Sequence, residues 1–169
     1  MTSTPETRRP RVPQLAELPF YSIYRHRFVR VAVATPCVEV ASPSANVVEI
    51  VRIARAAASS QAILVVFPEL GISAYSNEDL FQQDALLDGS VQALATLLEA
   101  SKEIAITLAV GMPLRVDDRL FNCAVLLRRG ELLGAVPKSY LPNYREFYEK
   151  RQFAPAAQAF ATSIRLLGQ

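Results

Sequence analysis

Two charged side chains follow apolar, strand-like stretches, and they are the residues most able to do chemistry. Glu69 closely follows the stretch 62–67, and Lys138 closely follows the stretch 132–136. Because ligands bind at the carboxyl ends of strands in open α/β sheets, we expect both side chains at one rim of a sheet. A partly desolvated carboxylate suits general acid–base work, and a lysine beside it can stabilise a developing oxyanion.

Each of these residues has an ordinary explanation when it is taken alone. Carboxylates are common at strand ends, where Glu69 could simply cap a helix or form a salt bridge in a loop. Lys138 taken alone would be read as a surface lysine after a strand. The prediction of a shared site therefore depends on the fold bringing the two residues together.

The stretch 137–149 combines aromatic hydroxyls with carboxylates: Tyr140, Tyr144, Tyr148, Glu146 and Glu149. Tyrosine offers rigid area and a hydrogen-bonding tip, which suits a loop that shapes a pocket for a small polar substrate. Tyr144 and the earlier Tyr75 are predicted to line that pocket, although half-buried packing is their alternative role. Glu146 is predicted to hold the lysine or the substrate, with a surface charge as its alternative. Glu149 is interpreted as a surface partner of neighbouring cations.

The two cysteines, Cys37 and Cys123, are candidate nucleophiles only in principle. Cys123 lies within a strand-like stretch, where an inert core thiol is the common outcome. Cys37 follows the first predicted strand. A Cys–His or Ser–His–Asp site would have to use His26, the only histidine of the chain, and we disfavour that chemistry. The sequence contains no glycine-rich phosphate loop and no metal-ligand motif.

The composition is that of a globular chain. It has 169 residues, of which 51% are hydrophobic and 20% are charged. The formal net charge is only +2, and no cluster of Lys and Arg alternates with aromatic residues, so nucleic-acid binding has no support. No apolar stretch reaches the roughly 18 residues that span a bilayer, so we expect no membrane contact. Two cysteines make no disulfide framework, which favours a reducing cytoplasm.

The elements that must position these residues alternate between strands and helices. Strands are predicted at 28–35, 62–67, 104–110, 120–127 and 131–136, the third of them ending at the Gly-Met-Pro stretch 111–113. One helix begins at Pro43, and a helical segment from Asn77 is expected to break at 89–90 before a second stripe. A tight hairpin is predicted at 128–130, and 163–167 is predicted to start a further strand. This order predicts an α/β fold with a mostly parallel sheet and an antiparallel addition.

A resemblance to a known family rests on Phe67-Pro68-Glu69-Leu70 and on the block from Pro137-Lys138 to Tyr148. The chain resembles the carbon–nitrogen hydrolase (nitrilase) superfamily, and within it the N-terminal glutaminase domains of glutamine-dependent NAD⁺ synthetases, over roughly residues 20–155. The resemblance implies the N-terminal half of an αββα sandwich. Residues 1–19 would be a flexible leader, residues 20–169 part of the hydrolase domain, and the synthetase domain would be absent.

What the resemblance implies chemically is a Glu–Lys–Cys triad. Glu69 would be the general base, Lys138 would stabilise the tetrahedral intermediate, and a cysteine beyond residue 169 would attack the side-chain amide of glutamine. Glu146 matches the second glutamate of the superfamily and Tyr144 matches a glutamine-contacting tyrosine, with Tyr75 beside it. No cofactor is expected in this segment, since ATP and Mg²⁺ would belong to the synthetase domain. The full-length protein would form a homo-oligomer, and this chain alone is expected to be inactive.

Two alternatives stay open. One is a stand-alone amidase of the same superfamily, and the other is a non-catalytic interaction module that kept the fold. A half-sandwich would also leave an apolar face and a sheet edge uncovered, so we expect the chain to associate unless a partner covers them.

Overall fold

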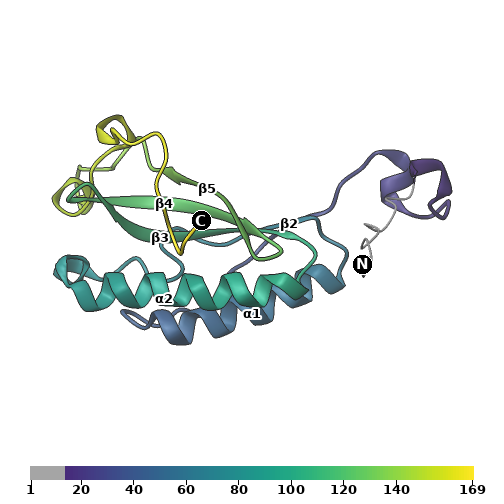
Figure 1. Cartoon of the computed structure of the whole chain (residues 1–169), viewed down its shortest axis with the longest axis horizontal. Coiled ribbons are helices and arrows are strands. Elements are labelled where there is room, and N and C mark those ends of the chain that lie inside the picture. Colours follow the sequence, from purple (N-terminus) through teal and green to yellow (C-terminus); the bar gives the residue numbers. More distant parts are fainter. Residues whose placement is uncertain (1–13) are drawn as a thin grey trace, which may run out of the picture.

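Five strands form a single sheet in the computed structural model, which describes residues 14–169. In chain order they are β1 (Val31–Val33), β2 (Leu64–Val66), β3 (Thr107–Val116), β4 (Arg119–Arg128) and β5 (Glu131–Pro137). They lie side by side in the same order as in the sequence (Figure 1). The pairings β1–β2 and β2–β3 are parallel, whereas β3–β4 and β4–β5 are antiparallel. The α/β class is confirmed, with half of the pairings parallel rather than most.

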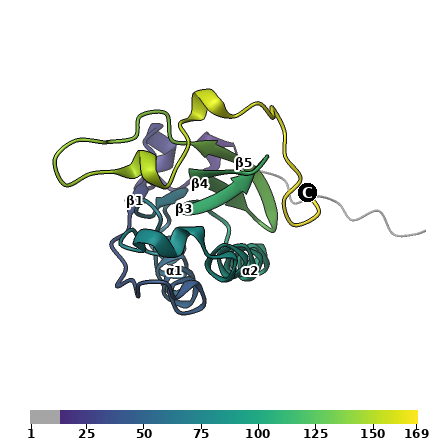
Figure 2. The same ribbon diagram turned by 90° about the vertical axis from the view of Figure 1, so that its left-hand side faces the viewer.

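Two long helices pack side by side on one face of this sheet, as Figures 1 and 2 show. They are α1 (Pro43–Ser59), which begins at the predicted proline, and α2 (Asp84–Ala100). Their buried side chains recur at helical spacing, so each helix turns one apolar stripe to the strands: Val47, Ile50, Ala54 and Ala57 from α1, and Ala93, Leu94, Leu97 and Leu98 from α2. The remaining helical segments are short 3₁₀ turns at Leu15–Glu17, Ile23–His26, Glu78–Gln82, Ser101–Glu103, Glu149–Arg151 and Ala156–Gln158.

The predicted break at Gly89-Ser90 is wrong, because α2 continues through both residues. The Ser90 hydroxyl donates a hydrogen bond to the Leu86 carbonyl at 2.8 Å, so its polar group is satisfied inside the helix. A Cβ at Gly89 would lie 3.7 Å from Pro43, which places this glycine where α2 passes the start of α1. The pair marks a close approach of two helices rather than the end of one.

The third predicted strand also does not end at 111–113, since β3 continues to Val116. The Gly111 carbonyl accepts the Ile72 N–H at 3.0 Å, on the side of β3 away from β4. Pro113, two residues later, directs its nitrogen to that same side, so the missing N–H removes no bond to β4. Proline therefore marks the point where β3 runs beyond the shorter β2.

Of two further predictions, the hairpin and the C-terminal strand, only the hairpin is present in the structure. The hairpin at 128–130 is confirmed, and its turn residues Arg129 and Gly130 both have positive φ, as a two-residue turn requires. The predicted strand at 163–167 is wrong. That segment is a loop, held by the Gln169 side chain, which accepts the Leu132 N–H and donates to the Gly130 carbonyl. Most of the predicted leader 1–19 lies outside the described residues.

The two faces of the sheet are covered very differently. The helix-covered face contributes fully buried side chains such as Val65, Leu108 and Leu127. The opposite face carries valines with large exposed fractions, from 40% for Val66 to 84% for Val33. No helix within residues 14–169 is both long and apolar enough to cross a membrane.

Candidate active site

The two strand-end side chains lie in direct contact. Lys138 Nζ is 2.6 Å from Glu69 Oε1, although the residues are 69 positions apart in the chain. The lysine side chain is 28% exposed and the glutamate side chain 40% exposed, so the pair sits at a partly solvated rim. The fold therefore supplies the proximity on which the prediction of a shared site depends.

A tight turn after β2 holds Glu69 in place. The Gly71 N–H donates to the Pro68 carbonyl at 3.1 Å, and this turn lies against β3. A Cβ at Gly111 would be only 2.3 Å from the Leu70 nitrogen, so a side chain there would push the turn away. Glycine is required at this position of β3 because the backbone that carries Glu69 approaches so closely.

Lys138 is fixed through its backbone as well as through its ammonium group. Its N–H donates to the Asn122 carbonyl at 2.8 Å, which continues the pairing of β4 with β5 by one residue. Its own carbonyl accepts the Ala156 N–H at 2.9 Å. The backbone of Lys138 is therefore fixed at the end of β5, because both its N–H and its carbonyl are hydrogen-bonded.

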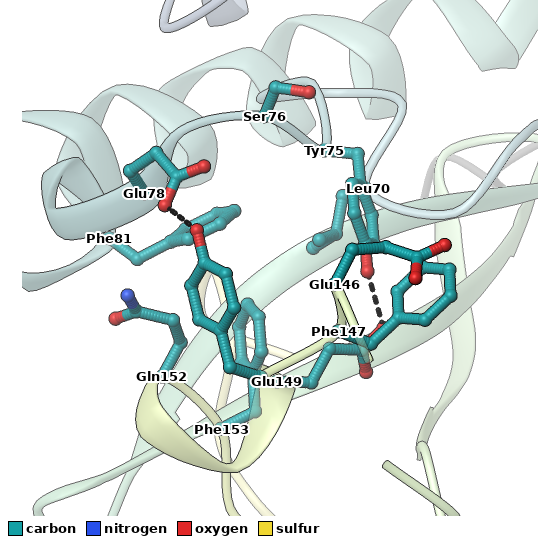
Figure 3. A pocket seen from close by; sticks show the side chains of 11 residues that line it. Leu70, Tyr75, Ser76, Glu78, Phe81, Glu146, Phe147, Glu149, Gln152 and Phe153 are labelled. Carbon is teal, nitrogen blue, oxygen red and sulfur yellow. Dashed lines mark hydrogen bonds between the residues drawn. The ribbon is translucent and has the colours of Figure 1, made fainter. Parts of the chain in front are cut away.

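A second carboxylate holds the lysine from the other side, and it is Glu149. Lys138 Nζ lies 2.9 Å from Glu149 Oε2 and 3.0 Å from Oε1, and the Tyr75 hydroxyl donates to Oε1 at 2.8 Å (Figure 3). Glu149 is only 6% exposed. The interpretation of Glu149 as a surface residue is therefore wrong, because the 3₁₀ turn that it begins directs its side chain inward.

The structure does not place Glu146 against the lysine. Its side chain lines a small cavity beside Phe147 (Figure 3). The carboxylates that Lys138 Nζ contacts are those of Glu69 and Glu149. The two acids are three positions apart, and Arg145 has a positive φ of 53° that sets the direction of the chain between the loop and the turn. Glu149, which begins the 3₁₀ turn after this segment, is the acid that reaches the lysine.

The environment changes two proton affinities at the site. Burial alone would lower the pKa of Lys138, but its hydrogen bonds to Glu69 and Glu149 outweigh burial and raise the pKa above its usual value. Burial, together with the bond to Glu149, raises the pKa of Tyr75. Both shifts favour the protonated form, so at neutral pH the site holds the Lys138 ammonium group and the protonated phenol of Tyr75.

Next to this cluster lies a cavity of about 190 Å³. Its wall combines aromatic, acidic and apolar side chains: Leu70, Tyr75, Ser76, Glu78, Phe81, Glu146, Phe147, Tyr148, Glu149, Gln152 and Phe153 (Figure 3). The predicted pocket residues Tyr75 and Glu146 line it. Tyr144 does not; it is 63% exposed, and its ring lies 5.9 Å from that of Phe147, which does line the cavity. Tyr148 lines it instead, and its hydroxyl donates to Glu78.

A wider hollow opens on the bare face of the sheet, where Glu69, Asn122 and Lys138 form part of the wall. Cys123 also lines this hollow, but it belongs to the main core, and burial raises the pKa of its thiol to about 12. A thiol that stays protonated is a poor nucleophile. Cys37 is exposed, and within residues 14–169 neither cysteine hydrogen-bonds to Glu69 or Lys138.

Two residues of this cluster have no predicted role at the site. Glu149 is interpreted from the sequence as a surface partner of neighbouring cations, and no function is predicted for Asn122. Asn122 is 4% exposed, and its side-chain amide donates to Glu69 Oε1 at 2.5 Å. A polar residue within the otherwise apolar stretch 120–127 was a usable signal, because a buried amide must find a partner. No three His, Cys, Asp or Glu side chains among residues 14–169 come together as metal ligands.

Comparison with known proteins identifies the family. Residues 30–168 match the carbon–nitrogen hydrolase family. The chain belongs to this family. Among individual proteins, the glutamine-dependent NAD(+) synthetase of Mycobacterium tuberculosis is 51% identical over 136 residues, and that of Mycobacterium leprae is 42% identical over 143 residues. These alignments cover 80% and 85% of this chain, and the chain spans about a fifth of the length of these relatives.

Solved structures of the family have the same fold. A glutamine-dependent NAD(+) synthetase from Cytophaga hutchinsonii aligns with a TM-score of 0.70 at 26% identity, covering 75% of this chain and 22% of that one. An amidase from Nesterenkonia sp. aligns with a TM-score of 0.64 at 23% identity, covering 75% of this chain and 48% of that one. The nitrilase-type fold predicted from the resemblance is confirmed.

Proposed function

We propose that this chain supplies the glutamate and the lysine of a Glu–Lys–Cys site that hydrolyses the side-chain amide of glutamine. The nucleophilic cysteine would come from sequence outside these 169 residues. The observation that carries the proposal is the position of Lys138 Nζ, held at 2.6 Å from Glu69 Oε1 and at 2.9 Å from Glu149 Oε2. The high identity to glutamine-dependent NAD(+) synthetases supports glutamine as the substrate.

The hydrogen bonds of the lysine support its role at the oxyanion. An ammonium group has three N–H donors. One is directed to Glu69 and one is shared between the two oxygens of Glu149, which leaves a third for a substrate oxygen. A donor fixed in advance where negative charge develops stabilises the transition state without reorganisation at the moment of reaction.

The reaction then needs one base and one acid, and Glu69 can serve as both. Its carboxylate takes the thiol proton, and the thiolate attacks the amide carbon while Lys138 donates to the oxyanion. The protonated Glu69 gives its proton to the leaving nitrogen, so ammonia departs and a glutamyl thioester stays. Glu69 next deprotonates a water that attacks the thioester, releasing glutamate and restoring the thiol.

In the complete protein we propose that the released ammonia serves NAD⁺ synthesis, in line with the activity for which these relatives are named. ATP and Mg²⁺ would act in a synthetase domain outside this chain. The chain contributes no cofactor ligand of its own to this proposal. The complete protein would be cytoplasmic and homo-oligomeric.

A chimera tests the proposal directly. Residues 30–168 of this chain would replace the matching region of the M. tuberculosis synthetase, and ammonia release from glutamine would be measured. We expect activity that falls about 10²- to 10⁴-fold in Glu69→Gln and Lys138→Met variants. Synthesis from added ammonium chloride is the folding control, since it bypasses amide hydrolysis. A Glu69→Gln chimera with full glutaminase activity would sink the proposal, and so would turnover by the unmodified 169-residue chain alone.

The two neighbouring glutamates provide a matched comparison within the same chimera. Glu149→Gln removes the charge that holds Lys138, so we expect at least about a 10²-fold loss of kcat. Glu146→Gln makes the same chemical change three residues away, without contact to the lysine, and should keep kcat within a few fold. Equal losses of kcat in both variants would show that the contact between Glu149 and Lys138 is not required for the reaction.

A stand-alone amidase for simple amides is the second candidate, favoured by the fold shared with the Nesterenkonia amidase. Propionamide and glutamine would be compared as substrates of the chimera. Preference for propionamide would favour this candidate. A non-catalytic module, the remaining alternative, requires that Glu69→Gln leave every function of the protein unchanged.

A further inference from the structure

Asn122 is a buried amide in the middle of an apolar strand. It lies in β4 between Phe121 and Cys123, which belong to the main core, and it is 4% exposed. Burying an amide without a partner costs free energy, so the partner of the side chain indicates why it is there. That partner is Glu69, one member of the catalytic pair.

One residue thus reaches both members of the pair. The Asn122 side-chain nitrogen donates to Glu69 Oε1 at 2.5 Å, and the Asn122 carbonyl accepts the Lys138 N–H at 2.8 Å. A carboxylate can only accept, so the amide nitrogen rather than the amide oxygen must face Glu69. The strand β4 therefore works as a common support for two segments that are distant in sequence.

The two oxygens of Glu69 are left in different states. Oε1 accepts from both Lys138 and Asn122, whereas no hydrogen bond within residues 14–169 reaches Oε2. If the amide were missing, the lysine could pair with both oxygens at once and occupy them. An ammonium group that donates to both oxygens lowers the basicity of each, so neither oxygen is left as the better acceptor for a thiol proton.

We propose that Asn122 is a positioning residue: it holds Glu69 by one oxygen so that the other oxygen stays free to take the thiol proton. The inference rests on the proposed function of Glu69 as general base. It adds which oxygen reacts and which residue keeps it available. Asn122 acts through Glu69 and need not touch the substrate amide.

The isosteric variant Asn122→Asp gives the sharpest test, in the chimera described above. It keeps the shape of the side chain but replaces the donor by an acceptor. At pH 8 we expect kcat to fall about 10²-fold, with KM within about twofold. As the pH falls, the introduced carboxyl and Glu69 share a proton, the donor is restored, and the ratio of variant to parent kcat rises. Asn122→Leu, which never regains a donor, should stay low at every pH.

Asn143→Asp is the matched control, because Asn143 is exposed in the loop that follows Lys138. It makes the same change near the site and should keep the parental pH profile. An Asn122→Asp profile parallel to that of the parent would overturn the proposal. If Glu69→Gln is itself fully active, the proposed function has failed instead, so the two failures are distinguishable.

A measurement on the unmodified 169-residue chain needs no variant. Scalar coupling across the hydrogen bond, between the Asn122 side-chain nitrogen and the Glu69 carboxyl carbon, should be detectable by NMR. The backbone bond from Lys138 to Asn122 should protect that amide from exchange in every variant, since no side chain takes part in it. Absence of the coupling in the folded chain would overturn the proposal even if no variant folds.

Discussion

The two faces of one sheet have opposite surroundings although both are built from apolar residues. In β2, Val65 points to the helices and is 0% exposed, while the adjacent Val66 points to the bare face and is 40% exposed. The same contrast holds between Val125 of β4, at 1%, and Val136 of β5, at 60%. Alternation of side chains along a strand explains the geometry but not the choice of residue types.

The difference shows on which face of the sheet the candidate site lies. A strand with apolar residues on both faces is typical of a sheet covered on both sides, so the bare face has the composition of an interface. Glu69, Asn122 and Lys138 all line the hollow on that bare face. The helix-covered face gives the strands a fixed platform, and the bare face presents the reactive groups.

The largest expected effect is a loss of folding stability at alkaline pH, caused by a cysteine buried under the helix-covered face of the sheet. Burial raises the pKa of Cys123 from 9.0 to about 12. This contribution to stability is fully present below pH 9, where the unfolded thiol is still protonated, and is lost as the pH rises to about 12. A shift of this size corresponds to about 4 kcal/mol. Denaturant unfolding from pH 8 to 11 should show the decline, and Cys123→Ala should flatten it. Identical slopes would contradict this account.

Two adjacent valines test the contrast between the faces themselves. Val65→Ala leaves a cavity under the helices and should lower the free energy of unfolding by about 2–3 kcal/mol. Val66→Ala deletes the same atoms on the bare face and should cost less than about 1 kcal/mol. Urea unfolding of both variants measures the difference. Equal losses would mean that the bare face is buried in solution, for example by a second copy of the chain.

Two glycines test the support beneath Glu69. Gly111→Ala forces the turn at Leu70 away from β3, so we expect a loss of about 1–2 kcal/mol and a weaker Glu69–Lys138 contact. Gly134→Ala in β5 has no atom within 4 Å of the new Cβ and should be neutral or slightly stabilising. Thermal unfolding compares the two variants. A neutral Gly111→Ala variant would show that the turn can shift without cost.

The smallest expected effect on stability comes from placing charges on the bare face, although these charges should clearly reduce self-association. Val33→Lys combined with Val136→Lys should change the free energy of unfolding by less than about 0.5 kcal/mol, since both side chains are exposed. The charges should reduce self-association, measured by sedimentation velocity. Val48→Lys on α1, where Val48 is 67% exposed, is the control and should leave association unchanged. A monomeric parent chain would remove the basis of this prediction.

Local patterns in the sequence determined most of the elements. Apolar periodicity located all five strands and α1, and it predicted α2 as two separate segments. Pro43 marked the start of α1, because these signals act between residues that are neighbours in the chain. The pattern failed at Gly89 and at Gly111, where glycine permits two segments to approach closely instead of ending an element. Local reading cannot separate these two uses of glycine.

The sequence by itself determined that a glutamate and a lysine follow apolar strands and that the family is that of carbon–nitrogen hydrolases. Only the tertiary structure decided which groups surround them. Glu149 rather than Glu146 holds Lys138, and Asn122 holds Glu69, through contacts between residues that are 11 and 53 positions apart. These contacts form because segments that are distant in the chain meet at the rim of the sheet. Where they meet depends on turn geometry and packing, which no local pattern encodes.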